Sequence, residues 1–241
     1  MIKQSKSVAI LQSCYIPWKG YFDLINMVDE FVLYDDMQYT RRDWRNRNMI
    51  KTSAGPLWLT IPVEVKGKYH QRINEVSVSG NEWRDKHWKS ISFNYAKSRH
   101  FKKFSGVFEE LYLGSVENKL SLINYSFITA INRILGIDTR LSWSSDYSLC
   151  EGKTERLVDI CRQAGAGRYI SGPSARGYID SELFERENIA LSWMDYSGYP
   201  QYRQLYPPFE HAISILDLIF NEGPDAQQLM KSFMISAELG I

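Results

Sequence analysis

The chain has 241 residues, of which 44% are hydrophobic and 24% are charged, a balance typical of a globular protein with a packed core. The net charge of +1 excludes the strongly basic surface expected of a nucleic-acid-binding protein. The three cysteines form no CxxC pair, so we expect neither a disulfide framework nor a zinc site and expect a cytoplasmic location.

The predicted elements begin with a strand, a helix and a second strand. Residues 8–12 are mostly apolar, residues 18–28 carry apolar side chains at helical spacing, and residues 30–34 are again apolar. This order favours two parallel strands joined by a right-handed crossover. No apolar run approaches the roughly 18 residues of a membrane span, so we expect no such segment.

The middle of the chain is predicted to be largely helical. Residues 41–55 are polar and basic and are predicted to be a loop, and residues 57–63 and 73–78 are predicted strands. Apolar residues three and four apart then predict three helices. They cover residues 81–97, 101–113 and 116–135, the last one stopped by Gly136.

The rest of the chain alternates between strands and helices. Strands are predicted at residues 139–142, 168–171 and 189–194. Helices are predicted at residues 153–165, 178–187, 212–220 and 225–237, and a proline-rich and tyrosine-rich loop at residues 197–209. We therefore expect an α/β protein: a three-layer Rossmann-like sandwich with a mostly parallel sheet. Residues 1–241 are predicted to form a single domain with a helical insertion at about residues 81–135.

Polar and aromatic residues follow the first predicted strand. They are Gln12, Tyr15, Trp18, Gly20 and Tyr21. Ligands of open parallel sheets bind outside the carboxyl ends of the strands, so this segment is a candidate substrate-binding site. Here Gly20 would let the backbone approach a ligand, and the start of the next helix offers N–H groups to an anion. The alternative is a plain strand-to-helix turn.

A second polar cluster follows the second predicted strand. Its candidate site residues are Asp35, Asp36, Gln38, Tyr39, Asn46 and Arg47, interleaved with further arginines. Adjacent carboxylates can hold Mg²⁺ or orient an amine or hydroxyl nucleophile, and guanidinium groups suit phosphate. The alternative is a solvated, charged loop.

Two further features could carry chemistry. Ser171, Ser174 and Arg176 lie where the segment YISGPSARGYID passes from a strand to a helix, a place that suits phosphate contacts. His87 lies on a predicted helix and is either an acid–base group or the surface histidine of a packing helix. The histidines show no metal-ligand spacing, and HExxH, GxSxG, P-loop and GxGxxG motifs are absent.

The order of these motifs along almost the whole chain resembles that of the WbqC-like protein family. The resemblance rests on Gln12, 15-YIPWKGYF-22, 35-DD-36, 38-QY-39, Trp44, 46-NR-47, 50-IK-51, Trp58, Pro62, Trp83, 87-HW-88, 169-YISG-172, Tyr178 and 214-SILD-217. Members of the family are encoded in bacterial surface-polysaccharide (O-antigen) clusters. The resemblance therefore implies a role in making or decorating an activated sugar.

A more distant similarity links the PWKGY segment to the ATP-binding signature of adenylyl-transferring Rossmann-like enzymes. The segment SGPSARGYID is likewise similar to the second signature of pantothenate-synthetase-like ligases, with Gly20 and Arg176 at the matching positions. The histidines of the first signature are missing. This similarity makes ATP and Mg²⁺ possible cofactors, whose use the sequence leaves unknown.

The first functional hypothesis is transfer of an acyl or aminoacyl group to the amine of a nucleotide-linked amino sugar. The nucleotide diphosphate would bind the loop at residues 41–47 and the turn with Ser174 and Arg176. The expected catalytic residues are Asp36 or Asp35 to orient or deprotonate the amine, Arg47 or Lys51 to stabilise developing charge, and His87 as a reserve base.

Two alternatives remain open. One is a nucleotidyltransferase or glycosyltransferase that uses the same acids with Mg²⁺. The other is a non-catalytic partner of the polysaccharide assembly machinery that binds a sugar nucleotide. All three hypotheses have a nucleotide-sugar small molecule as partner, and the oligomeric state stays unknown.

Overall fold

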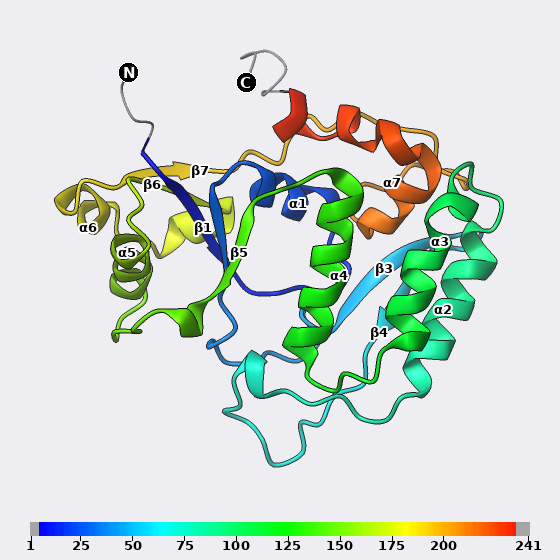
Figure 1. Ribbon diagram of the computed structural model, residues 1–241, viewed down its shortest axis with the longest axis horizontal. Helices are drawn as coiled ribbons and strands as arrows, with labels where there is room; N and C mark the ends of the chain where they lie inside the picture. Colours follow the sequence, from blue (N-terminus) through cyan, green and yellow to red (C-terminus); the bar gives the residue numbers. More distant parts are fainter. Residues whose placement is uncertain (1–4, 235–241) are drawn as a thin grey trace.

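A parallel five-stranded sheet forms the centre of the computed structural model, which describes residues 5–234 (Figure 1). The strand order is β5–β2–β1–β6–β7, and every pairing is parallel. The strands are β1 (Ser7–Leu11), β2 (Glu30–Leu33), β5 (Arg140–Trp143), β6 (Arg168–Ser171) and β7 (Ala190–Trp193). The chain moves outward from β1 to β5 and then returns to the other side of β1 as β6. The topological switch point therefore lies between β1 and β6.

Helices cover both faces of the sheet. Alternate side chains of a strand point to opposite faces, and accordingly Ala9 and Phe31 belong to one buried cluster while Val8 and Val32 belong to another. The first cluster includes side chains of α1 (Lys19–Asn26) and α4 (Leu120–Leu135). The second includes side chains of α5 (Thr154–Gln163) and α6 (Ser181–Arg186). The predicted three-layer Rossmann-like fold is confirmed.

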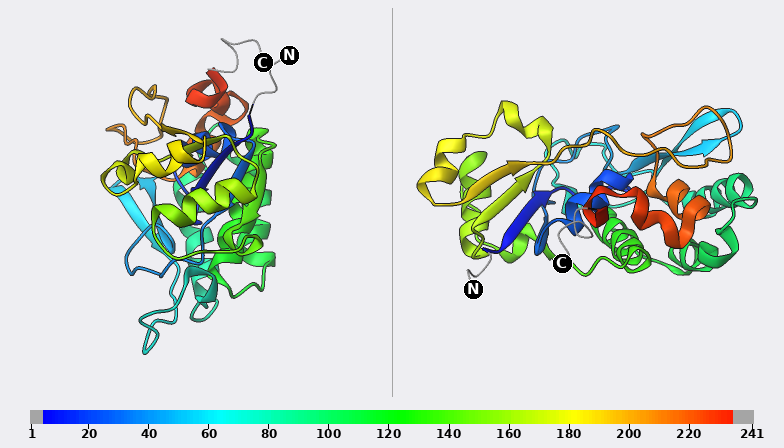
Figure 2. Two further views of the ribbon diagram at one scale, coloured as in Figure 1. Left: turned by 90° about the vertical axis from the view of Figure 1, so that its left-hand side faces the viewer. Right: turned by 90° about the horizontal axis from the view of Figure 1, so that it is seen from above.

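A large insertion separates β2 from β5. It begins with an antiparallel hairpin, β3 (Arg47–Thr52) and β4 (Gly55–Thr60). It continues with α2 (Glu82–Tyr95), α3 (Phe101–Glu109), a π-helical turn (Glu110–Gly114) and α4. Figure 2 shows this part at the end of the molecule opposite α5, α6 and β7. As predicted, Gly136 ends α4, in the left-handed conformation with φ of 63°.

The C-terminal segment returns to the N-terminal unit. After the loop at 197–209 come α7 (Ile215–Glu222) and a 3₁₀ helix (Gly223–Leu229). Ile215 N donates to Pro17 O (2.9 Å) and Ser214 N to Met49 O (2.9 Å). The buried carboxylate of Asp23 in α1 accepts hydrogen bonds from the backbone N–H groups of Lys231 and Ser232 (3.1 and 2.9 Å). This segment therefore ties α1 to the hairpin.

Three predicted elements need correction. The loop predicted at residues 41–55 contains β3, whose polar residues hide the strand pattern. The strand predicted at residues 73–78 is a 3₁₀ turn (Ile73–Glu75) followed by isolated bridges, because no neighbouring strand pairs with it. The helix predicted at residues 225–237 begins as the 3₁₀ helix above, and its part beyond residue 234 lies outside the described residues.

The division into domains stays a prediction. The insertion between β2 and β5 is longer than the predicted helical insertion at about residues 81–135, because it also contains the β3–β4 hairpin. None of the helices in residues 5–234 is long and apolar enough to cross a membrane.

Candidate functional site

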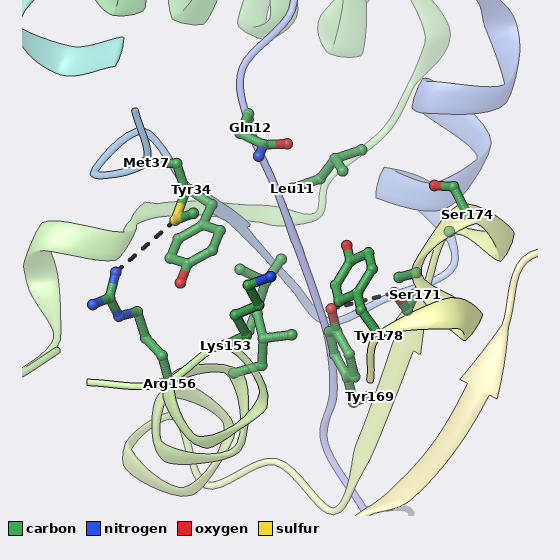
Figure 3. A pocket seen from close by; sticks show the side chains of 15 residues that line it. Leu11, Gln12, Tyr34, Met37, Lys153, Arg156, Tyr169, Ser171, Ser174 and Tyr178 are labelled. Carbon is green, nitrogen blue, oxygen red and sulfur yellow. Dashed lines mark hydrogen bonds between the residues drawn. The ribbon is translucent and has the colours of Figure 1, made fainter. Parts of the chain in front are cut away.

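A cavity of about 500 Å³ opens at the carboxyl edge of the sheet, at the switch point between β1 and β6 (Figure 3). Its floor is made by Ile10, Leu11 and Gln12 at the end of β1 and by Tyr34 and Met37 after β2. The start of α5 and the 173–178 turn form its walls. Both its place and its size are those expected of a small-molecule site in an open α/β sheet.

Two cations approach the cavity from the first turn of α5. Lys153 is the residue before the helix, and Arg156 follows one turn later. Arg156 Nε donates to Cys150 O (2.8 Å), and its Nη1 lies 3.9 Å from Met37 Sδ. In the part of the chain that the structure describes, Lys153 forms no ion pair. Cations without an acidic partner, beside the N–H groups of a helix start, form a binding surface for phosphate or another anion.

The opposite wall offers hydroxyl groups and an aromatic ring. Ser171 ends β6, Ser174 lies on the turn, and Figure 3 shows both on the side of the cavity away from α5. Tyr178 also lines the cavity and is 58% exposed. The buried Tyr169 donates to Ser171 Oγ (3.4 Å). The cavity thus combines cations at one wall with small hydroxyls and an open aromatic ring at the other, which suits a nucleotide.

The predicted site residues divide between this cavity and other places. Gln12, Ser171 and Ser174 line it. Arg176 lies on the same turn but does not line the cavity, because its guanidinium carbon lies 5.5 Å from the centre of the Trp193 ring. The structure therefore brings together the polar cluster after β1 and the one after β6. Gln12 represents the first cluster in the cavity, and Ser171 and Ser174 represent the other.

Gly20 makes room for a side chain of the protein itself. A Cβ at this position would lie 2.4 Å from a carbon of the Trp18 indole. The indole packs against Tyr196 and Tyr199, with ring centres 5.1 and 5.7 Å away. Tyr21 is buried, and its hydroxyl donates to Gln12 O (3.0 Å). The conformation of the Gln12 segment thus depends on this aromatic group.

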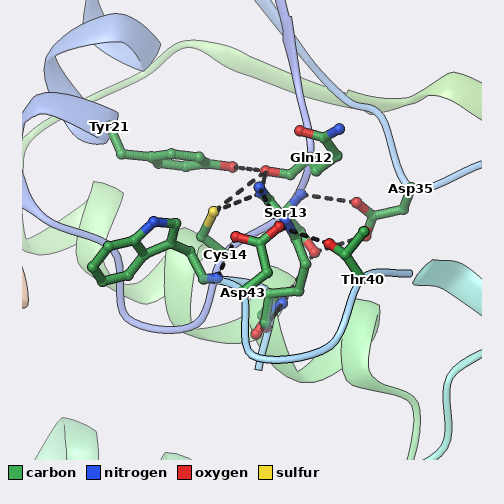
Figure 4. Close-up of polar contacts among 10 residues, drawn as sticks. Gln12, Ser13, Cys14, Tyr21, Asp35, Thr40 and Asp43 are labelled. Atoms are coloured by element: carbon green, nitrogen blue, oxygen red, sulfur yellow. Dashed lines mark hydrogen bonds and ion pairs between the residues drawn. The ribbon is translucent and has the colours of Figure 1, made fainter. Parts of the chain in front are cut away.

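The two adjacent aspartates have different partners. Asp35 is buried and accepts hydrogen bonds from Ser13 N (2.8 Å) and Ser13 Oγ (2.7 Å), as Figure 4 shows. Burial raises the pKa of this carboxyl above its ordinary value. Asp36 accepts from Ser144 Oγ (2.5 Å) and from Asn74 Nδ2 (3.2 Å). Neither lines the cavity, and within residues 5–234 no group of three His, Cys, Asp or Glu side chains is arranged to hold a metal ion.

A partly buried arginine fixes the segment that follows β1. Arg45 Nη1 donates to Cys14 Sγ (2.9 Å) and to Gln12 O (3.4 Å), and Arg45 Nη2 pairs with Asp43 (3.6 Å). Thr40 donates to the same carboxylate (2.7 Å) (Figure 4). Burial raises the pKa of the Cys14 thiol to about 11, so the sulfur is a packed thiol at neutral pH.

His87 belongs to a buried hydrogen-bonded group. Its Nδ1 lies 2.9 Å from the hydroxyl of Tyr15, which also bonds to Tyr112. Burial lowers the pKa of His87 to about 4, which leaves the imidazole neutral at pH 7. Lys51 is likewise buried, and its ammonium group donates to the carbonyl of Pro208.

The remaining predicted residues lie in and before the hairpin. Gln38 Nε2 donates to Tyr69 O (2.9 Å), and Tyr39 is buried beside it. Asn46 Nδ2 donates to Ile61 O (2.8 Å), and the guanidinium of Arg47 lies over an indole ring of the hairpin. Gln38 and Tyr39 line a smaller, separate cavity, and none of these four residues lines the switch-point cavity.

Sequence reasoning missed the cations of the cavity. The available signal was Gly152-Lys153-Thr154 at the predicted start of a helix, with Arg156 one turn further. A cation pair at the N-terminus of a crossover helix is a recognisable anion site once the strand order is known.

One of the comparisons with known proteins shows a family. The sequence model of the WbqC-like protein family matches residues 12–229, which include the cavity-lining residues from Gln12 to Tyr178. An uncharacterized protein of Mycobacterium tuberculosis is 52% identical over 226 residues, covering 94% of this chain and 98% of the relative. No solved structure matches the chain significantly.

Proposed function

The chain belongs to the WbqC-like protein family, and we propose that it is a cytoplasmic enzyme of bacterial surface-polysaccharide (O-antigen) biosynthesis. Its substrate is a nucleotide-linked amino sugar, and the reaction transfers an acyl or aminoacyl group to the sugar amine. The observation that carries the proposal is the switch-point cavity with Lys153 and Arg156 at the start of α5. The family resemblance supplies the class of reaction.

The cavity offers a partner to each part of a nucleotide. Lys153 and Arg156 face the diphosphate, with the N–H groups at the start of α5. Ser174 donates from the opposite wall, and Tyr178 offers a ring on which a base can stack. The amide of Gln12, at the end of β1, forms hydrogen bonds with the nearest hydroxyl groups of the sugar nucleotide.

In the proposed reaction, the amine nitrogen attacks the carbonyl carbon of an activated acyl group. A C–N bond forms, the bond from the carbonyl carbon to the leaving group breaks, and the amine loses one proton to a base. Asp36 is the proposed base, because it directly precedes Met37 of the cavity floor and its carboxylate is held by Ser144. ATP and Mg²⁺ would be needed only if the same enzyme activates the acyl donor.

A second candidate is a non-catalytic protein that binds the sugar nucleotide and presents it to the assembly machinery. One observation favours it: the residues that line the cavity include no Asp, Glu, His or Cys. The cavity can therefore bind a phosphorylated ligand without a carboxylate, imidazole or thiolate of its own to accept a proton.

The binding half of the proposal is tested by calorimetric titration with UDP- and dTDP-linked amino sugars and with ATP. Lys153→Met and Arg156→Met should each weaken binding about tenfold or more, because each removes a charge-assisted contact to phosphate. The control is Lys102→Met, which removes an exposed cation of α3. Equal affinity of all four proteins would exclude the cavity as the nucleotide site.

The catalytic half is tested by mass spectrometry of the sugar nucleotide after incubation with acyl and aminoacyl donors. Asp36→Asn should keep its nucleotide affinity and lose product formation. Binding without any product in the wild-type protein, across the donor set, would favour the non-catalytic candidate. Wild-type turnover by Asp36→Asn would remove that carboxylate from the mechanism.

A further inference from the structure

Two tryptophans and an arginine form an exposed group on the hairpin, far along the chain from the cavity walls. Trp44 is 42% exposed and Trp58 is 41% exposed. Their ring centres lie 5.4 Å apart with a 38° angle between the planes. The guanidinium carbon of Arg47 lies 4.2 Å from the centre of the Trp58 ring. We refer to these three residues as the indole platform.

The platform stands on the outer face of the hairpin. In the antiparallel register Arg47 pairs with Thr60 and Met49 with Trp58, so these side chains share one face. The other face carries Asn48, Ile50 and Leu59, which are all buried. Trp58 therefore leaves an apolar surface in water beside Arg47 and Thr60, although Lys51 on the same face is buried.

The arginine of the platform has no anionic partner. In residues 5–234 Arg47 forms no ion pair, and its Nε is buried without a hydrogen-bond partner. By contrast, Arg45 two positions earlier pairs with Asp43. The buried Nε is out of reach of a ligand, so an anionic group from outside the chain would bind the terminal Nη1 and Nη2 donors of this guanidinium.

We propose that the indole platform binds a saccharide whose sugar ring carries an acidic group, a carboxylate or a phosphate. The apolar C–H face of a pyranose packs on an aromatic face, and Trp44 and Trp58, 42% and 41% exposed, offer such faces beside the guanidinium that lies over Trp58. The acidic group then reaches the free donors of Arg47, and the exposed hydroxyl of Thr60 on the same face can bond to a ring hydroxyl.

The size of the platform favours this ligand over a protein partner. A stable protein interface covers roughly 800 Å² on each side and needs a central cluster of apolar side chains with a broad rim. Two half-exposed indoles supply a surface for one or two sugar rings. Their rings contact each other, so no slot remains between them into which a planar base could insert.

The platform is connected to the switch-point cavity through one short segment. Trp44 O accepts a hydrogen bond from Tyr15 N (3.0 Å), and the neighbouring Arg45 donates to Gln12 O, whose residue lines the cavity. A saccharide on the platform would thus lie beside the Gln12–Tyr15 segment. The inference does not need the cavity to bind a nucleotide, so either proposal can fail while the other stands.

The test is a titration followed by protein NMR and tryptophan fluorescence. The probes are glucuronate, glucose 6-phosphate, neutral glucose and inorganic phosphate. A monosaccharide of this size should bind with a Kd on the order of 1 mM. Both acidic sugars should bind more tightly than glucose, and inorganic phosphate alone should bind more weakly than glucose 6-phosphate.

Matched variants separate the platform from the rest of the hairpin. Trp58→Ala should lose at least about tenfold in affinity for both acidic sugars, whereas Trp58→Phe, which keeps a ring, should retain most of it. Arg47→Gln should lower the affinity for acidic sugars and leave that for glucose unchanged. Leu57→Ala is the control, because this 41% exposed side chain lies on the opposite face of the same strand.

Circular dichroism and thermal unfolding establish that each variant is folded. Unchanged glucuronate affinity in Trp58→Ala would overturn the proposal, as would equal affinity for inorganic phosphate and glucose 6-phosphate. Absence of binding by every sugar at concentrations well above about 1 mM would overturn it as well.

Discussion

Acidification from pH 7 to pH 5 should destabilise the fold through His87. The imidazole is 7% exposed, and burial lowers its pKa from the ordinary 6.5 to about 4. The unfolded chain therefore takes up the proton first as the pH falls. The contribution of His87 is fully present above about pH 6.5 and is lost as the pH falls toward 4. Between pH 7 and pH 5 these two pKa values correspond to about 2 kcal/mol of unfolding free energy.

The assay is urea unfolding of the wild type and of His87→Gln at both pH values. Glutamine keeps a donor and an acceptor but cannot be protonated, so the variant should lose about 2 kcal/mol less than the wild type between pH 7 and pH 5. Carboxyl groups such as Glu30 and Asp43, whose pKa values are lowered in the folded state, contribute equally to both proteins.

His70→Gln is the control, because it removes an exposed histidine. Equal losses in the wild type and in His87→Gln would refute the reasoning. So would an NMR titration in which the His87 ring has a midpoint near 6.5. That second result would also strengthen His87 as an acid–base group, since it would then change its charge near neutral pH.

Three further predictions concern residues near the N-terminal unit and α7. Gly20→Ala should lower the free energy of unfolding in urea by roughly 1–3 kcal/mol, because its Cβ would overlap the Trp18 indole. An unchanged free energy would mean that the ring has room to move. Asp217→Ala should cost at least about 2 kcal/mol in the same assay, because Tyr95 and Tyr202 both donate to this buried carboxylate; a neutral result would show that water replaces it. Burial lowers the pKa of Lys19 to about 8, so the unfolded chain holds this proton more tightly and the free energy of unfolding should rise between pH 8 and pH 10. Lys19→Met should flatten that rise, and an identical slope in the variant and the wild type would contradict this prediction.

The parallel core could be predicted because its strands are buried on both faces. Residues 8–12 and 30–34 read as continuous apolar runs, which is how strands covered by helices on both sides appear in a sequence. Gln12, Ser171 and Ser174 could be assigned to the site because they directly follow such strands. Lys153 and Arg156 could not, since their proximity to β1 arises only from the return of the chain across the sheet to β6.

The hairpin strand β3 was hidden by buried polar residues. Asn48 is buried because its amide donates to the carbonyls of Tyr15 and Ile16 (3.1 and 3.0 Å). Lys51 is buried because its ammonium reaches the carbonyl of Pro208. Both partners lie far away along the chain, so nothing local indicates that these polar residues face the interior. A period-two pattern cannot be recognised when a buried amide lies on one face of the strand and a buried ammonium group on the other.

The tie between α1 and the C-terminal segment has a consequence for the order in which the protein matures during synthesis. The Asp23 carboxylate is buried, yet its partner Ser232 is translated 209 positions later. Until then, the nascent N-terminal unit would have to bury a charge without these donors, which is unfavourable. The strand–helix–strand unit should therefore stay open on the ribosome and close late, and its apolar strands are the natural target for a chaperone in that interval.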